Sequence, residues 1–419
     1  MLLKTILNRV QRHKSFVYDK ITMIEKPQGD PVLEVTLKAR TNSQPIGSGC
    51  HRAGPTYDRL PKRLFLFVPL WQIQVYFVYA MRRVNCPHCG KVIVEEVPWA
   101  VGKSRLTKAY QSFLARWAQR MSWQEVARAF HTTWDHVYSS VQYAVQWGLV
   151  HRVTEGVKTI GVDEIQYARG HQYLTLVYQI DKGCKRLLWV GKERTADCLR
   201  GFFQLMGEPF ARELKFVCSD MWRAYLDVIA EQAPQAVHVL DRFHIMKLMN
   251  KAIDEVRRAE VKRLKDDGYE PILKNSRWCL LKRLENMTKK QTVKLSELMR
   301  YNLQSMRAKL SRDDFQRFWD YESVGWASKF LEEWCSRTMR SKIEPMKKVA
   351  RTLRSHKELI LNWFRADGEL SSGVVEGFNN KAKLAMRKAY GFRTYEAIQL
   401  ALYHQLGALP TPKTTHEFS

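Results

Sequence analysis

The chain has 419 residues, of which 45% are hydrophobic and 11% aromatic, enough apolar material for two or three packed domains. Its 69 Lys and Arg residues against 42 Asp and Glu residues give a formal net charge of +27. A surplus of this size exceeds what solubility requires and indicates a polyanionic partner, with nucleic acid as the first candidate. Charge alone does not identify the partner, because solvated surfaces and membrane-binding proteins can also be basic.

The sequence predicts a protein without a membrane span or an export signal. Its first residues mix bases into a short apolar stripe and lack a small-residue cleavage site. The most hydrophobic stretch, residues 64–80, is interrupted by Pro69, Gln72 and Gln74. The eight cysteines are too few and too scattered for a disulfide scaffold. We therefore expect a cytoplasmic protein with no membrane partner.

A small β domain that is similar to a zinc ribbon is expected within residues 1–99. β-branched and aromatic runs fill residues 32–99 and alternate with breaks rich in Gly, Pro and Ser. Cys86 and Cys89 form a CPHC knuckle, whose proline and following Gly90 favour the turn of a zinc site. A tetrahedral site needs further ligands, and the candidates are Cys50 with His51 or His88. The alternative is a domain without zinc that is held by an apolar hairpin over residues 64–80.

The hydrophobic period becomes helical in residues 100–152 and predicts helices over 106–119, 122–130 and 133–147. Ser122 and either Thr132 or Thr133 are predicted N-caps. The last two helices are similar to a helix-turn-helix, whose second helix would enter the major groove of DNA. Its expected DNA contacts are polar residues of the turn and the second helix: Thr132, Thr133, His136 and Ser139. The alternative is a three-helix packing that does not contact DNA.

An α/β domain is predicted from residue 157 to about residue 265. Three strands come first, VKTIGVDEI, YLTLVYQID and KRLLWVG, and two later strands, LKFVCSD and QAVHVLD, alternate with helices. The helices are expected near residues 195–206, 222–232 and 242–265. This order predicts a mixed sheet with helices on its faces.

The chain after this sheet is expected to be helical. Residues 271–365 show no strand pattern, and helices are predicted again over 374–389 and 395–406. Because the tryptophans of 271–365 stand among other apolar residues, we expect them in a core rather than stacked on bases. They are Trp278, Trp319, Trp326, Trp334 and Trp363.

Three carboxylates stand out in so basic a chain. Asp163 follows the strand TIGV, and Asp220 follows FVCS and opens a helix, so both are expected at the ligand-binding edge of the sheet. Glu376 begins a helical face that continues with Asn380, Lys383 and Arg387, with Lys381 close by. Carboxylate oxygens suit Mg²⁺ or Mn²⁺. The alternative is that the aspartates are caps or turn residues and the glutamate a solvated charge.

Read together, the motifs GVDE, CSDMWRAY, VLDRFHIMK and VVEGFNNKAKLAMRKAYGFR resemble the ISL3 family of bacterial insertion-sequence transposases over residues 45 to 410. The resemblance implies a ribonuclease H-like domain over residues 153–410, with a helical insertion at about 271–365. It implies an Asp-Asp-Glu triad of Asp163, Asp220 and Glu376 that binds Mg²⁺. It further implies double-stranded DNA as partner, as terminal inverted repeats and target DNA, and a homodimer or larger assembly on that DNA.

Two features qualify this expectation. Asp241 and His244, in DRFH, follow a predicted strand and either support the metal site or form an ordinary helix cap. The first cysteine knuckle reads GSGC, with Gly47 where members of the family usually have a cysteine. The alternatives to an active transposase are a domesticated or decayed DNA-binding regulator of the same fold and a structure-specific nuclease.

Overall fold

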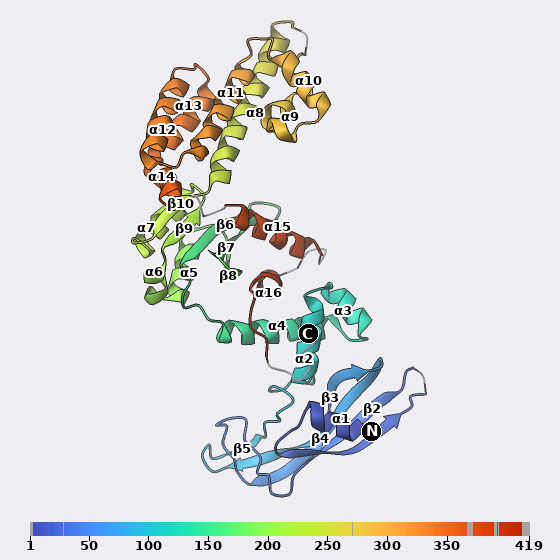
Figure 1. Ribbon diagram of the computed structural model, residues 1–419. Helices are drawn as coiled ribbons and strands as arrows, with labels where there is room; N and C mark the ends of the chain where they lie inside the picture. Colours follow the sequence, from blue (N-terminus) through green and yellow to red (C-terminus); the bar gives the residue numbers. More distant parts are fainter. Residues whose placement is uncertain are drawn as a thin grey trace. The chain divides into compact units, whose positions relative to one another are not determined.

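The computed structural model describes residues 3–27, 29–269, 271–366, 372–388, 392 and 394–412. They form two compact units, whose helices and strands are labelled in Figure 1. The first unit comprises residues 1–153 and 384–419, and the second comprises residues 154–383. Among the described residues, no helix combines the length and the apolar character that crossing a membrane demands.

The first unit begins with a five-stranded sheet of order β1-β2-β4-β3, in which β5 also pairs with β4. Its elements are α1 (Leu3–Val10), β1 (Phe16–Ile24), β2 (Val32–Ala39), β3 (Thr56–Leu70), β4 (Ile73–Cys86) and β5 (Lys91–Val94). The long β3–β4 hairpin confirms the predicted apolar hairpin. Trp99 is fully buried in its aromatic core. The sequence patterns did not predict α1 and β1.

Four helices complete the first unit: α2 (Lys108–Ala118), α3 (Trp123–Ala129), α4 (Trp134–His151) and α16 (Tyr395–Leu406). Ser122 forms a capping box with Glu125 at the start of α3, and the Thr133 hydroxyl accepts from the backbone of His136 at the start of α4. The predicted helices and caps are therefore confirmed. The side chain of Gln405 in α16 donates to the carbonyl oxygens of Ala118 and Gln119, which attaches α16 to α2.

The second unit is built on a five-stranded mixed sheet of order β10-β9-β6-β7-β8. Its strands are β6 (Thr159–Ala168), β7 (Gln172–Asp181), β8 (Cys184–Lys192), β9 (Phe216–Ser219) and β10 (Val237–Leu240). The first three strands are antiparallel neighbours, while β9 and β10 run parallel to β6. This arrangement confirms the predicted strands and the mixed α/β architecture.

The two faces of this sheet pack against different helices. Ile160 and Val162 of β6 belong to an apolar core with residues of α5 (Ala196–Met206), α6 (Glu208–Glu213) and α7 (Arg223–Gln232). Side chains alternate along a strand, so Gly161 and Asp163 face the opposite side. There β6 and β7 meet α15 (Ser372–Lys388), with the ring of Tyr178 stacked 4.9 Å from that of Phe378.

A helical region lies between the sheet and α15 along the chain. It contains α8 (Arg242–Asp266), α9 (Arg277–Leu281), η1 (Leu284–Asn286), α10 (Lys289–Leu298), α11 (Gln304–Gln316), η2 (Arg317–Asp320), α12 (Val324–Met339), α13 (Glu344–Ser355) and α14 (Lys357–Arg365). Trp319 and Trp334 are buried in its core, and Trp363 packs against it. Trp278 and Trp326 are 53% and 61% exposed, so the core prediction was wrong for these two. Apolar residues such as Leu280 and Phe330 stand near them in the sequence, but the side chains of Trp278 and Trp326 themselves lie on exposed parts of their helices.

Buried histidines make the stability of the fold pH-dependent. His238 of β10 is 7% exposed and hydrogen-bonds Ser219 through Nε2, and burial lowers its pKa to about 4. Below pH 6.5 the unfolded chain binds a proton there that the folded chain does not, so stability falls as the pH falls toward 4. We expect His238→Gln to reduce the loss of unfolding free energy between pH 7.5 and pH 5 by about 2 kcal/mol. Urea titrations at both pH values measure this loss, and an unchanged loss would contradict the assignment.

Candidate catalytic site

Strand register places three aspartates in one row at the edge of the second sheet. Gly161 of β6 pairs with Cys218 of β9, so Asp163 stands level with Asp220 two residues further on. Ser219 pairs with Leu240 of β10, and the Asp241 backbone N–H donates to the Ser219 carbonyl oxygen at 2.8 Å, which places Asp241 in the same row. Adjacent strands lie about 4.8 Å apart. The topology therefore gathers three carboxylates from segments far apart in the sequence.

Asp163 lies inside β6 rather than beyond its end and is only 9% exposed. Its Oδ1 accepts from the backbone N–H of Glu164 at 2.7 Å, and its Oδ2 accepts from the amide of Asn379 at 2.6 Å. Burial raises its pKa, as do the charges of Asp241 and Asp220, while the His244 charge and the bond from Glu164 act in the opposite direction. A carboxylate in this position gains stability from a nearby cation.

Asp220 follows β9 and is also 9% exposed. Its Oδ1 accepts from the backbone N–H of Trp222, so it forms a turn before α7, as the capping alternative supposed. Its Oδ2 receives the Arg194 guanidinium at 3.1 Å. Arg194 also contacts Glu164 at 3.1 Å and lies over the Trp222 ring. Burial, assisted by the Asp220 charge, raises the pKa of Glu164 to about 7.

Asp241 and His244 stand at the start of α8. Asp241 is the N-cap of this helix, because its Oδ1 accepts from the Phe243 backbone N–H at 2.7 Å. The Nδ1 atom of His244 lies 3.7 Å from the other Asp241 oxygen, and His244 is one of the charges that act on Asp163. The capping interpretation is confirmed for Asp241, which also belongs to the aspartate row, and His244 lies beside it.

Glu376 is placed differently from the aspartates. It is exposed on α15, as are Asn380, Lys383 and Arg387 of the predicted polar face. Asn379, one helical turn after Glu376, is 6% exposed and contacts Asp163. The structure thus places α15 against Asp163 and places Glu376 within one turn of that contact. Lys381 is also exposed, and its Nζ lies over the Phe378 ring.

Comparison with known proteins identifies the family of this chain. Residues 160–402 match a family described as "Transposase" of the ISL3 type, and this match covers more than half of the chain. The chain belongs to the ISL3 family of transposases. Residues 95–145 match the "Helix-turn-helix domain of transposase family ISL3".

Two curated proteins are similar to this transposase over most of its length. The transposase for insertion sequence element IS1001 of Bordetella parapertussis is 29% identical over 366 residues, which cover 87% of this chain and 88% of the relative. The transposase for insertion sequence element IS1557 of Mycobacterium tuberculosis is 28% identical over 432 aligned positions, which cover 96% of this chain and 95% of the relative.

The helix-turn-helix of this transposase is formed by α3 and α4. Thr133 is exposed, whereas Thr132, His136 and Ser139 are half-buried. The last three are joined by local hydrogen bonds: Thr132 Oγ1 lies 2.8 Å from His136 Nδ1, and the Ser139 hydroxyl donates to the His136 carbonyl oxygen. Burial lowers the pKa of His136. The predicted residues therefore gather in the turn before α4 and in the first turns of that helix.

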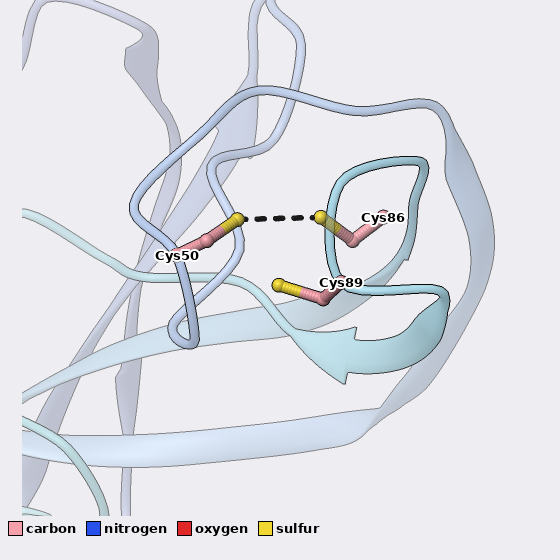
Figure 2. Close-up of side chains that lie close together, drawn as sticks. All are labelled: Cys50, Cys86 and Cys89. Carbon is pink, nitrogen blue, oxygen red and sulfur yellow. Dashed lines mark hydrogen bonds between the residues drawn. The ribbon is translucent and has the colours of Figure 1, made fainter.

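The three cysteines of the first unit lie together, as Figure 2 shows. The sulfur atoms of Cys50, Cys86 and Cys89 all lie within 4.8 Å of one another, and those of Cys50 and Cys86 are 3.3 Å apart. The Cys89 backbone N–H is the main reason that the pKa of Cys86 is lowered to about 7. Three thiols at this spacing suit a zinc ion.

A fourth protein ligand is less evident at this cluster. His51 Nδ1 lies 3.0 Å from Glu96, and His88 Nδ1 lies 3.1 Å from the Arg52 guanidinium. A Cβ atom added at Gly47 would stand 2.5 Å from the Ile93 Cδ1 atom. The space beside Gly47 is therefore filled by the Ile93 side chain.

Sequence patterns missed three residues of the candidate catalytic site: Tyr178, Arg194 and Asn379. Arg194 and Tyr178 stand in segments without a motif, and their contacts arise only when the sheet forms. Asn379 belongs to the EGFNNK motif, and its place three residues after Glu376 was an available signal. The predicted helical face contained Glu376 and Asn380 but not Asn379.

Proposed function

We propose that this transposase cuts DNA at the terminal inverted repeats of an insertion sequence and joins the ends to target DNA. Mg²⁺ or Mn²⁺ would be held by Asp163, Asp220 and Glu376. The observation that carries this proposal is the row of aspartates across β6 and β9, to which α15 is attached through Asn379. Carboxylate oxygens from different segments, buried and close to one another, suit a hard divalent cation.

When bound, such ions activate a water molecule or a 3′-hydroxyl group and stabilise the leaving oxygen at phosphorus. The chain itself orients the ligands. Asp163 is held through both carboxylate oxygens, and Asp220 through a backbone N–H and Arg194. Such fixed orientation lowers the entropic cost of reaching the reactive geometry. Asp241 and His244 are proposed to support this site without binding the metal.

Recognition of the inverted repeats is proposed for the first unit. The second helix of the helix-turn-helix, α4, would enter the major groove, with Thr132, Thr133, His136 and Ser139 near the bases. On α15, the cations Lys381, Lys383 and Arg387 would contact phosphates beside the metal site. This division assigns sequence recognition and strand chemistry to different parts of the chain.

The catalytic domain is proposed to have a ribonuclease H-like fold, with residues 271–365 as an insertion. The described sheet supports this, because its fourth and fifth strands run parallel to the first, and the helical region follows the last strand. Residues 271–365 contain 22 Lys and Arg against 10 Asp and Glu, which supports a role in gripping the DNA backbone with strongly salt-dependent affinity. Binding two DNA ends implies a homodimer or a larger assembly.

A reconstituted reaction tests this function. The protein is incubated with labelled DNA that carries one terminal repeat, with a target plasmid, and with Mg²⁺ or EDTA. Metal-dependent cuts at the repeat and joined product support a transposase. Cutting of branched DNA without any joined product would support the structure-specific nuclease instead. Genomic DNA that flanks the gene should also show terminal inverted repeats and a short direct duplication.

The altered first cysteine knuckle favours one alternative function, a regulator that binds DNA but has lost catalysis. Gly47 replaces the cysteine that the family usually has, and Ile93 fills the space beside it. Such a regulator would bind repeat DNA equally well before and after Asp163→Ala. It would also give no Mg²⁺-dependent product in either form, so the two functions are separable in one experiment.

We propose that Cys50, Cys86 and Cys89 hold a zinc ion, with His51 or His88 as the remaining candidate ligands. We expect about one zinc per chain in the purified protein and its loss in Cys86→Ser, because a structural site depends strongly on each ligand. Cys184→Ser is the matched control, since Cys184 is exposed and lies outside the cluster. Elemental analysis measures the ratio. A native protein without stoichiometric zinc would exclude the metal site.

A further inference from the structure

A chain of two buried hydrogen bonds connects strand β7, helix α15 and Asp163. The Tyr178 hydroxyl donates to Asn379 Oδ1 at 2.8 Å, and Asn379 Nδ2 donates to Asp163 Oδ2 at 2.6 Å. Tyr178 is fully buried, and Asn379 and Asp163 are 6% and 9% exposed. Water has little access to hydrogen bonds in such surroundings and does not compete for their polar groups. The bonds therefore hold these groups in one orientation.

The chemistry of the three side chains determines which of them donates and which accepts in these two hydrogen bonds. An ionised carboxylate only accepts hydrogen bonds, so the NH₂ side of the Asn379 amide must face Asp163. The oxygen side then faces Tyr178, whose hydroxyl must donate. Burial raises the pKa of Tyr178 well above its usual value, so this hydroxyl keeps its proton. An amide is therefore the group that satisfies both neighbours, and a carboxylate at position 379 would oppose Asp163.

Asn379 is poorly placed to bind a metal itself. The oxygen of an amide is its metal-binding atom, and in Asn379 this oxygen accepts from Tyr178. Its NH₂ group carries hydrogens that face Asp163 and cannot bind a cation. The contribution of this side chain therefore passes through Asp163.

Because Asn379 belongs to α15, its hydrogen bond to Asp163 also holds the helix that carries Glu376. Glu376 precedes it by one turn of the same helix, so the two residues lie on adjacent parts of the helix surface. The bond to Asp163 thus fixes one oxygen of the first carboxylate and also one turn of the helix that carries Glu376. Val375 against Gly161 and Phe378 against Tyr178 hold the same turn on the sheet.

We propose that Asn379, oriented by Tyr178, is a positioning residue that aligns the Asp163 carboxylate with the helix bearing Glu376. This inference rests on the proposed function, because it concerns the geometry of that metal site. It assigns a role to the first asparagine of the EGFNNK motif. It also makes Tyr178, on the neighbouring strand, part of the support of the site.

Asn379→Ala and Tyr178→Phe test this proposal, with Tyr173→Phe as the matched control. Tyr173 lies on the same strand, β7, and is half-buried away from this hydrogen-bonded chain. Removing a partner that orients a metal ligand typically reduces metal affinity or activity about 10- to 100-fold. We expect a loss of this size in Mg²⁺-dependent cutting by Asn379→Ala, with a higher Mg²⁺ concentration at half-maximal rate. Tyr178→Phe should show a smaller loss of the same kind, and Tyr173→Phe none.

Two further measurements separate positioning from a merely structural role. Mn²⁺ binding, followed by the electron paramagnetic resonance signal of the free ion, should weaken in Asn379→Ala while repeat-DNA binding and the melting temperature stay near the native values. The double variant should lose no more than Asn379→Ala alone, because both changes act on one chain of bonds. Native metal affinity and native cutting by Asn379→Ala would overturn the proposal. If Asp163→Ala also cuts normally, the proposed function fails as well, so the two failures are distinguishable.

Discussion

Asparagine in place of Asp163 is expected to abolish Mg²⁺-dependent cutting and joining, with a loss of about a thousandfold or more. Residues that act as one catalytic unit show losses of this order when a single member is removed. Asparagine keeps the size of the side chain and removes the charge that a divalent cation requires. Asp220→Asn should cause a similar loss. The measurement is the rate of product formation on repeat DNA, with DNA binding followed in parallel by gel shift.

The same experiment determines whether Glu376 is the third metal-binding carboxylate. We expect Glu376→Gln to be as inactive as the two aspartate variants, while Glu396→Gln, an exposed carboxylate on α16, should cut normally. Asp241→Asn is the informative comparison, because Asp241 shares the row of Asp163 and Asp220. Normal cutting by Glu376→Gln together with inactive Asp241→Asn would transfer the third position to Asp241. Equal product from the native protein and all these variants would exclude a carboxylate metal site.

Strand patterns are local, so the sequence was sufficient to predict that Asp163 and Asp220 follow the strand segments TIGV and FVCS. The runs TIGV and FVCS predict strands, and the structure confirms both as β6 and β9. Their alignment needs a further fact, the parallel pairing of Gly161 with Cys218, which no local pattern contains. Whether Asp163 stood inside its strand was equally open from the sequence. Register is a tertiary property, since it depends on which strands become neighbours.

The rest of the site depends on contacts across long stretches of chain. Asn379 meets Asp163 across 216 positions, and Tyr178 meets Asn379 across 201. A helical period gives the spacing of faces on α15 but not the face that the sheet will cover. The exposed Trp278 and Trp326 illustrate the same limit, because apolar neighbours along the chain do not determine which side of a helix is buried.

The pairing of α16 with α2 was likewise invisible in the sequence. α16 follows α15 directly along the chain, yet Gln405 binds the carbonyl oxygens at the end of α2, within the first unit. The cysteine cluster shows the opposite case. Its CPHC knuckle was recognisable by spacing, and the structure brings Cys50 to it. Short motifs with strict spacing are readable, whereas the packing partners of helices are not.

Gly161→Val is expected to reduce cutting by about a hundredfold through displacement of α15, on the scale of a misplacement of about 1 Å in a catalytic group. A Cβ atom at Gly161 would stand 2.6 Å from the Val375 Cγ2 atom, which is too close for two carbon atoms that are not bonded to each other. Because packed interiors yield little, the helix must move outward. The hydrogen bond from Asn379 to Asp163 would then lengthen, and Glu376 would leave its place.

A paired variant tests this cause directly. Gly161→Ala should lower the cutting rate less than Gly161→Val. Adding Val375→Ala to Gly161→Val should restore part of the lost rate, because it removes the methyl group with which the new side chain clashes. Such rescue gives a coupling between the two sites that independent effects would not produce. Gly201→Ala, in helix α5, is the control, since its added Cβ atom would lie 3.9 Å from the Trp189 ring. Repeat-DNA binding should remain unchanged throughout. Native cutting rates in Gly161→Val would show that catalysis does not require α15 to lie this close to β6.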